Sequence, residues 1–376
     1  MKILILGAGP FQQPVIKRAN QLGHSTLVAD SNPDAPGMRD AELAVPISST
    51  DTLALLKLAE EQKIDGVLTT SDYPVKSVAR ISEYLGLRGL TVNAAEICTN
   101  KFRQREVLKR FDLPTPDYHR LQPSDEPPKS LKFPVIVKPI DSSASRGVSK
   151  VLDLGDLNVA VEYARSFSKL GEVIIEEYLE GQEFSVEVLV QEEPHIIAIT
   201  QKITSGDQGK FFVEECHVVP AILESSQDAM IRECVTEAIR AAGITHAACH
   251  IEVMVKNSAA FIIEIAARLG GDYITSHLVP LATGVDMLEA IINISLGLPI
   301  KSDVTLDRFA GVRFLTPKNY NLSIKKINSL KGDKDLITFD HNPNCDSEVL
   351  RTSFDRLGYW ICCSDDRQTL IEKLSY

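Results

Sequence analysis

The sequence predicts a multidomain fold with α/β and α+β parts: an N-terminal doubly wound parallel sheet followed by two α+β lobes. Three observations support this prediction. Residues 1–95 alternate short apolar runs with helix-length amphipathic segments, residues 133–180 follow a strand–strand–helix–strand pattern, and the strands lengthen from residue 183 onward. The chain has 376 residues, which at roughly 150 residues per domain suggests two or three domains.

The N-terminal domain is predicted to span residues 1–95. It opens with a buried strand at residues 3–6, a helix at residues 11–22 and a second strand at residues 25–29. The alternation continues to a helix that Gly86 ends. Strands that alternate with helices in this way predict a parallel sheet covered on both faces.

The segment of residues 96–132 is predicted to be a helical linker. A helix is expected over residues 93–111, because Asn93 can cap it and Glu96 occupies the third helical position. A proline-rich polar stretch follows. Residues 133–180 then predict a small α+β lobe that serves as a lid.

The remainder of the chain is predicted to form a large lobe over residues 181–300 and a C-terminal subdomain over residues 301–376 packed on it. The large lobe contains one helix at residues 229–242 and four long strands, at residues 183–190, 195–203, 247–256 and 260–265. Runs of antiparallel strands with a covering helix are typical of an α+β unit.

Composition restricts the classes of partner. The chain has 40 Lys and Arg against 51 Asp and Glu, a net charge of −11, and no basic run. This balance argues against nucleic acid or an anionic membrane surface as the main partner. No apolar stretch reaches the roughly 18 residues of a membrane helix, so we expect a cytoplasmic protein that binds small molecules.

The seven cysteines include no CxxC pair, and adjacent Cys362 and Cys363 cannot readily close a normal disulfide. We expect buried reduced thiols and no structural zinc site.

A glycine turn follows the first strand and suggests one candidate cofactor. Gly7 and Gly9, followed by Asp30, fit a nicotinamide-dinucleotide site, because glycines let a pyrophosphate approach a helix N-terminus. The third glycine of that motif is replaced by Gln12. Ordinary turn chemistry is the alternative interpretation.

The clearest local pattern is a hairpin that carries two carboxylates. A hairpin turning about Ser258 places Glu252 and Glu264 opposite each other, since each lies six residues from the turn. Like charges that face each other destabilise a sheet, and a divalent cation such as Mg²⁺ or Mn²⁺ would offset this repulsion. The alternatives are two solvated glutamates or a register that differs by one residue.

Arg268 follows four residues after Glu264, and Gly270 and Gly271 come directly after it. An arginine in this place can bind phosphate oxygens bidentately, and paired glycines let backbone amides approach an oxyanion. The alternative is an arginine paired with a surface carboxylate beside an ordinary turn.

Two further segments carry weaker signals. Lys138 ends an apolar strand and precedes a hydroxyl-rich loop at residues 141–147 that could cover phosphates. An acidic connector at residues 176–183 could present its backbone to adenine and the Glu183 carboxylate to ribose hydroxyls. Each pattern alone is also typical of a solvated loop.

In order and spacing, these motifs, together with Lys101, resemble the ATP-grasp ligases, and the resemblance covers nearly the whole chain. It implies an ATP-grasp fold of two lobes and an N-terminal domain that does not bind the nucleotide. The ATP-binding residues that it implies are Lys101, Lys138, Ser142, Ser143, Ser145, Glu176, Glu177, Tyr178, Leu179 and Glu183.

The resemblance also implies a mechanism. Glu252 and Glu264 would hold Mg²⁺, with Mn²⁺ as a substitute, and Arg268 would stabilise the transferring phosphoryl group. The family makes an acylphosphate from a carboxylate and ATP, and an amine then displaces phosphate. Two departures stand out: Ala266 replaces a frequent Asn and cannot ligate a metal, and Ala144 replaces a frequent glycine of the phosphate loop.

Within the family, the motif after Glu264 and the segment of residues 212–220 most resemble the L-amino-acid ligases. The resemblance maps an amino-acid pocket onto Glu214 and His217, and a carboxylate suits an ammonium group. The spacing of these two residues requires a bend in the strand if they are to share a face. A strand-end glutamate and a core histidine are the alternative.

The sequence therefore predicts an ATP- and Mg²⁺-dependent carboxylate–amine ligase that acts on a small carboxylate and an amine, with amino acids as the expected substrates. A homodimer is compatible with the sequence. The alternatives are a carboxylase or aminoimidazole-type ligase that uses carboxyphosphate, a catalytically silent nucleotide-binding subunit, and a nicotinamide-dependent oxidoreductase.

Overall fold

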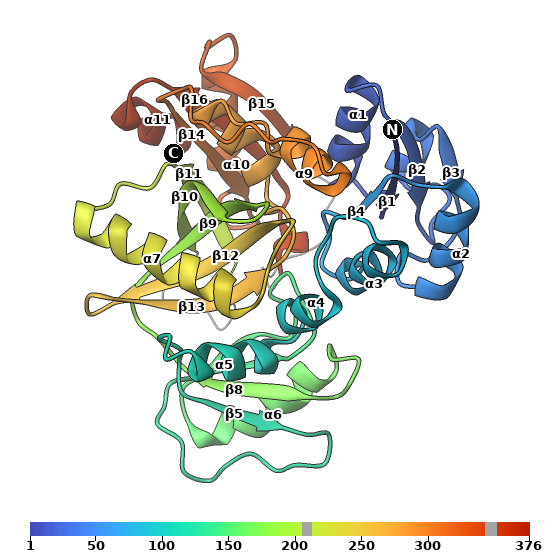
Figure 1. Cartoon of the computed structure of the whole chain (residues 1–376). Helices are drawn as coiled ribbons and strands as arrows, with labels where there is room; N and C mark the ends of the chain where they lie inside the picture. Colours follow the sequence, from blue (N-terminus) through green and yellow to red (C-terminus); the bar gives the residue numbers. More distant parts are fainter. Residues whose placement is uncertain (205–212, 343–351) are drawn as a thin grey trace.

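The computed structural model describes residues 1–204, 213–342 and 352–376 (Figure 1). Phe212, the first residue of the segment of residues 212–220, and Cys345, one of the seven cysteines, lie outside these residues. The N-terminal sheet has the strand order β3-β2-β1-β4 and all its pairings are parallel, as predicted. Its strands and helices are β1 (Lys2–Leu6), α1 (Gln13–Gln21), β2 (Ser25–Ala29), β3 (Leu43–Val45), α2 (Thr52–Gln62), β4 (Gly66–Leu68) and α3 (Val75–Leu85).

The linker contains two helices where the sequence predicts one. Thr91, not Asn93, caps α4 (Val92–Cys98) by accepting a hydrogen bond from the Ala94 amide, and Asn100 caps a new helix, α5 (Lys101–Arg110). Asn caps compete with helix continuation because their side chains bond the following backbone amides. The break makes Lys101 the first residue of α5, where its backbone amide donates to Ile140 O.

The small lobe is an antiparallel sheet of strand order β5-β8-β6-β7 covered by one helix. Its elements are β5 (Tyr118–Leu121), β6 (Val135–Pro139), β7 (Ser149–Val151), α6 (Leu154–Arg165) and β8 (Val173–Glu177). The predicted strand–strand–helix–strand block is present. The sequence analysis missed β5, a short strand that the linker contributes to the lobe's edge.

The large sheet has the strand order β13-β12-β9-β10-β11-β14-β16-β15. The C-terminal strands extend the sheet of the large lobe. The elements are β9 (Gln182–Val190), β10 (Pro194–Thr204), β11 (Glu214–Val219), α7 (Ser225–Ala241), β12 (Ala247–Lys256), β13 (Ala259–Ala266), α8 (Val279–Thr283), α9 (Met287–Leu296), β14 (Phe309–Leu315), α10 (Tyr320–Leu330), β15 (Leu336–His341), β16 (Gly358–Ser364) and α11 (Arg367–Leu374).

One apolar core joins the N-terminal domain to the large sheet. Ile3 and Ile5 of β1 and Ile16 of α1 belong to the same buried cluster as Met287 and Ile294 of α9. In Figure 1, α9 lies between the N-terminal domain and the C-terminal strands. A shared apolar core of this kind holds two domains in a defined relative position.

Two composition-based expectations can be compared with the described residues. The cysteines at 98, 216, 234, 249, 362 and 363 are free and buried. Burial raises the pKa of the Cys98 thiol to about 12, which keeps it protonated. Among the described residues, no single helix is long and apolar enough to cross a membrane, and the pair Ile274–Thr283 and Met287–Leu296 meets the length criterion only across a 110° bend.

Candidate active site

A cavity of about 640 Å³ lies where the N-terminal domain, the small lobe and the large sheet meet. This volume is typical of small-molecule sites. The structure brings the predicted site residues together around it, with the exception of Gly270. The site is therefore built from residues more than 100 positions apart, such as Lys138 and Arg268.

The hairpin of β12 and β13 places Glu252 directly opposite Glu264, as predicted. Near the turn the pairing register differs from the expected one by one residue: Lys256 pairs with Ala259, and Asn257 and Ser258 adopt left-handed φ values of 49° and 60°. A β-bulge then leaves Ile263 without a partner and restores the register at the glutamates. Without the bulge, Ile263 would face Glu252.

Each of these glutamates is paired with a lysine. Lys202 Nζ lies 2.9 Å from Glu252 Oε1, and Lys101 Nζ lies 2.9 Å from Glu264 Oε1. The two ammonium groups offset the repulsion between the carboxylates. Within the described residues no cluster of three acidic, histidine or cysteine side chains could hold a metal alone. Two carboxylates that face one cavity fit Mg²⁺ that is also held by phosphate oxygens.

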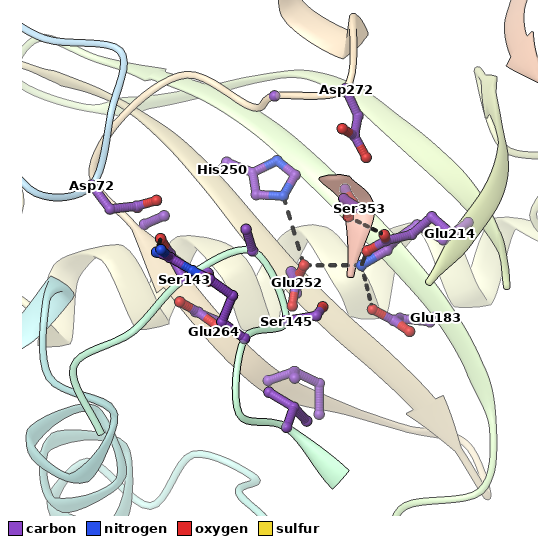
Figure 2. Close-up of a pocket in the computed structure, with 18 of the residues that line it drawn as sticks. Asp72, Ser143, Ser145, Glu183, Glu214, His250, Glu252, Glu264, Asp272 and Ser353 are labelled. Atoms are coloured by element: carbon purple, nitrogen blue, oxygen red, sulfur yellow. Dashed lines mark hydrogen bonds and ion pairs between the residues drawn. The ribbon is translucent and has the colours of Figure 1, made fainter. Parts of the chain in front are cut away.

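Lys202 is at the centre of an acidic cluster. Its side chain is only 4% exposed, and its Nζ lies 2.5 Å from Glu183 Oε1 and 3.4 Å from Glu214 Oε1, besides the contact with Glu252. Figure 2 shows these three carboxylates converging at one end of the cavity. Burial opposes the charge on Lys202, but the carboxylates raise its pKa well above the usual value. Lys202 therefore links the predicted ribose, metal and substrate residues.

Glu214 and His217 share a face of β11 because the strand contains a bulge. Lys202 pairs with His217 and Thr204 pairs with Glu214, which leaves Glu215 as the extra residue. In a regular strand, side chains three residues apart would point to opposite faces. The bend that the sequence requires is thus a β-bulge, and both side chains line the cavity.

The sequence analysis missed Arg356, which joins these residues from the C-terminal segment. Its Nη2 donates to Glu214 Oε2 at 2.9 Å and its Nη1 donates to Asp272 Oδ2 at 2.8 Å. His217 Nε2 lies 3.4 Å from the same Asp272 oxygen. Burial opposes ionisation of Asp272, but Arg356 and His217 lower its pKa. No motif around Arg356 predicts this role, because its partners lie far away in the sequence.

Lys138 emerges at the end of β6, as predicted, and its Nζ lies 2.7 Å from Glu176 Oε2. The buried Arg105 binds the same carboxylate through Nε at 2.7 Å and Nη2 at 3.2 Å. Burial alone would raise the pKa of Glu176, but Arg105 and Lys138 lower it to about 2. The Glu176 side chain is thus held in ion pairs, and it positions Lys138 at the cavity.

The hydroxyl-rich loop of residues 141–147 closes one side of the cavity. Lys101 Nζ donates to Ser142 O at 2.7 Å, which ties the loop to α5. Ala144 and Ser145 adopt left-handed φ values of 57° and 55°, a region that glycine populates at lower cost. Ala144, which replaces a frequent glycine of the phosphate loop, therefore occupies a strained backbone position. Ser142, Ser143 and Ser145 line the cavity.

The connector after β8 forms another part of the cavity wall. Tyr178 and Leu179 line the cavity, and Lys150 Nζ lies 3.7 Å from the centre of the Tyr178 ring. Glu177 Oε1 accepts a hydrogen bond of 3.1 Å from Lys256 Nζ, which ties the small lobe to the large sheet. These contacts place the predicted adenine segment between the two lobes.

The two glycines after Arg268 differ in their surroundings. A Cβ on Gly270 would lie 2.7 Å from Glu187 Oε1 and from His250 Nδ1, whereas a Cβ on Gly271 would meet no atom of the described residues within 4 Å. Gly270 thus packs against a buried pair whose atoms, His250 Nδ1 and Glu187 Oε1, are 2.5 Å apart, and Gly271 faces the cavity. Despite burial, Glu187 raises the pKa of His250 to about 9.

The N-terminal glycine turn does not have the shape of an open dinucleotide site. The Gln12 side chain lies over both glycines, since its Cγ is 3.3 Å from a Cβ built on Gly7 and its Oε1 is 2.9 Å from one built on Gly9. Asp30 Oδ2 accepts a hydrogen bond from the Ala8 amide at 2.8 Å. Both features favour the interpretation as turn chemistry.

Comparisons with known proteins agree with this geometry. Residues 131–276 match a family model described as an ATP-grasp domain. A formate-dependent phosphoribosylglycinamide formyltransferase of Rhodococcus jostii is 27% identical over 57% of this chain and 53% of its own length. An alanine–anticapsin ligase of Bacillus subtilis is 26% identical over 64% of this chain and 56% of its own length. This chain thus spans little more than half of either relative.

Solved structures match over almost the whole chain. An L-amino acid ligase from Bacillus licheniformis has a TM-score of 0.81 at 21% identity and covers 99% of this chain and 95% of its own. An N5-carboxyaminoimidazole synthetase from Staphylococcus aureus, complexed with ADP, has a TM-score of 0.76 at 18% identity and covers 100% of this chain and 97% of its own. The chain therefore has the ATP-grasp fold, and its residues 131–276 are similar to the ATP-grasp domain.

Proposed function

We propose that this protein is an ATP-dependent carboxylate–amine ligase that forms an amide through an acylphosphate and releases ADP and phosphate, with an α-amino acid as one substrate. The observation that carries the proposal is the joint arrangement, in one cavity, of Lys101, Lys138, Arg268 and the opposed pair Glu252 and Glu264. Cations suit the phosphates of ATP, and the two carboxylates suit the metal that accompanies them.

In this proposal ATP binds between the small lobe and the large sheet. Lys101 and Lys138 contact its phosphates, the loop of residues 141–147 covers them, and residues 176–179 hold adenine, with Glu183 at the ribose. Glu252 and Glu264 would hold Mg²⁺, which neutralises phosphate charge when bound. Arg268 donates to the oxygens of the transferring phosphoryl group, where charge develops.

The reaction then has two steps. A carboxylate oxygen of the first substrate attacks the γ-phosphorus, and ADP leaves. The amine nitrogen of the second substrate attacks the acyl carbon, loses a proton, and inorganic phosphate leaves. Fixed donors such as Arg268 favour both steps because they need no reorganisation when the charge forms.

The acidic end of the cavity favours an amino acid over a phosphorylated substrate. Among the described residues, its cations Lys202 and Arg356 each contact at least two carboxylates, so neither is free for a dianionic phosphate. An ammonium group could instead share Glu214 with these cations. The resemblance to L-amino acid ligases points to the same substrate class.

A screen of amino acids and other carboxylates tests the proposal through ATP-dependent phosphate release, with mass spectrometry of the products. Transfer of ¹⁸O from the substrate carboxylate to phosphate is expected, because the acylphosphate breaks at the acyl carbon. AMP as the product would reject the mechanism. Release of ADP that depends on bicarbonate or formate, with no amino acid required, would favour the alternative acyl donor that the formyltransferase and aminoimidazole relatives suggest.

A further inference from the structure

The N-terminal domain supplies a carboxylate to the active site. Asp72 lies in the loop after β4, and its Oδ1 accepts a hydrogen bond from Arg268 Nε at 2.9 Å, while its Oδ2 accepts one from Arg268 Nη2 at 3.1 Å. Both residues line the cavity. A bidentate pair fixes the plane of a guanidinium group as well as its position.

The loop that carries Asp72 is itself anchored to the N-terminal sheet. The buried Thr69 donates through Oγ1 to Leu6 O at 2.8 Å, at the end of β1, and accepts from the Ser71 amide at 3.1 Å. Thr69 thus anchors the start of the loop that carries Asp72 to the paired strands β1 and β4. A group held on a rigid element can orient its partner more accurately than one on a free loop.

The same loop also reaches the small lobe. The Tyr73 hydroxyl accepts a hydrogen bond from Arg146 of the phosphate loop, and Lys169 Nζ lies 4.8 Å from the centre of the Tyr73 ring. Adjacent residues of one N-terminal loop thus contact the large sheet through Arg268 and the lid through Arg146. The loop meets both halves of the nucleotide site.

Within the described residues, the hydrogen bonds of Arg268 use only some of its guanidinium N–H donors. Besides the two bonds to Asp72, Nη1 donates to Leu269 O at 3.0 Å. A guanidinium group has five N–H donors, so among the residues that the structure describes one N–H on each Nη nitrogen has no partner. Burial opposes ionisation of Asp72, but Arg268 and, to a smaller extent, Lys101 and His250 lower its pKa, so the pair is charged at neutral pH.

We infer that Asp72 is a positioning residue for Arg268. By holding the Nε edge, it directs the remaining N–H donors toward the oxyanion that forms during transfer. This inference rests on the proposed function in that Arg268 acts on the transferring phosphoryl group. It adds that the N-terminal domain, which the family resemblance places outside nucleotide binding, completes the catalytic centre through one side chain.

The test compares Asp72→Asn, Asp72→Glu and a matched surface control, Asp34→Asn. Asp72→Asn keeps shape but turns one acceptor into a donor, so we expect kcat to fall about 10- to 100-fold, as for a misplaced catalytic group. The KM for ATP should stay within about twofold, and Asp72→Glu should recover part of the loss. Adding Asp72→Asn to Arg268→Lys should cause little further loss, since both changes act through one pair.

A readout that needs no turnover keeps the inference separate from the proposed function. The Arg268 Nε–H resonance, assigned by its disappearance in Arg268→Lys, should shift or broaden in Asp72→Asn but not in Asp34→Asn. An unchanged resonance, or a changed one with wild-type kcat, would overturn the positioning role. A rise in substrate KM with kcat unchanged would also overturn it, because Asp72 would then contact the substrate. If the wild type turns over none of the substrates screened, the proposed function fails, while the resonance still decides whether Asp72 orients Arg268.

Discussion

Glu252 lies directly opposite Glu264 in the register of β12 and β13, and each carboxylate contacts a different lysine. Because the lysines already neutralise the pair, we expect Mn²⁺, used as a spectroscopic probe for Mg²⁺, to bind strongly only together with ATP. Glu252→Gln and Glu264→Gln should each weaken ATP-dependent Mn²⁺ binding at least tenfold, on the order of the loss of one charged ligand. Electron paramagnetic resonance of free Mn²⁺ measures this, with the exposed Glu61→Gln as control. Wild-type binding in both variants would remove the metal site from the hairpin.

Lys138→Ala should weaken the binding of MgADP by about 10- to 100-fold, the usual contribution of a hydrogen bond to a charged group. The fold should survive, since Glu176 keeps its bidentate partner Arg105. Gly9→Ala is the matched comparison: its new Cβ would meet only the flexible end of Gln12, so nucleotide affinity should not change. Isothermal titration calorimetry measures both. Tight NADH binding that Gly9→Ala abolishes would instead restore the dinucleotide interpretation.

Arg268→Lys keeps the positive charge but loses the planar fork that bonds both oxygens of Asp72. We expect kcat to fall about 100-fold, which corresponds to roughly 3 kcal/mol of transition-state stabilisation. Circular dichroism and thermal unfolding should match the wild type. Full turnover in a folded Arg268→Lys protein would show that Arg268 does not act on the phosphoryl group.

Glu214→Gln should raise the amino-acid KM about tenfold or more and leave the ATP KM within twofold, because it removes the charge that pairs with the substrate ammonium group. The change also removes a partner of Arg356 and Lys202, so a second variant is informative. Arg356→Lys keeps a cation beside Glu214 and should affect the amino-acid KM less. An equal rise in both KM values for Glu214→Gln would indicate a structural Glu214.

The pH dependence of stability should report on Glu176. Its pKa is about 2 in the folded protein against 4.5 for the unperturbed group, so its ion pairs stabilise the fold above pH 4.5 and are lost as the pH falls toward 2. At about 1.4 kcal/mol for each pH unit, the full effect is on the order of 3 kcal/mol. Glu176→Gln should lower the urea concentration at the midpoint of unfolding at pH 7. This midpoint should then fall less steeply between pH 4.5 and pH 2 than it does in the wild type. An acid decline as steep as that of the wild type would contradict the assignment.

Local sequence patterns predicted the sheets and many of the residues that line the cavity. Most of the site features that the sequence did not predict are contacts between residues far apart in the chain. The hairpin glutamates were predictable because strand alternation and a short turn fix their relation within 13 residues. The bulge at Ile263 was not, since bulges leave no periodic signal in a single sequence. Asp72 and Arg268 lie 196 residues apart, and Arg356 lies 84 residues from Asp272. Only packing of the N-terminal domain and the C-terminal strands onto the large sheet brings such pairs together.

Arg105 joins the small lobe to the large sheet. Its guanidinium group bonds Glu176 of β8 in the small lobe, and it also donates to Ile262 O at 3.0 Å and Ile263 O at 2.6 Å in β13 of the large sheet. One buried side chain on α5 is thus fastened to both lobes at once. A rotation of the small lobe about Arg105 would preserve these bonds. In such a rotation the rim of the small lobe would move over the cavity, while Lys138 and Glu264, which lie beside residues that Arg105 contacts, would keep their spacing.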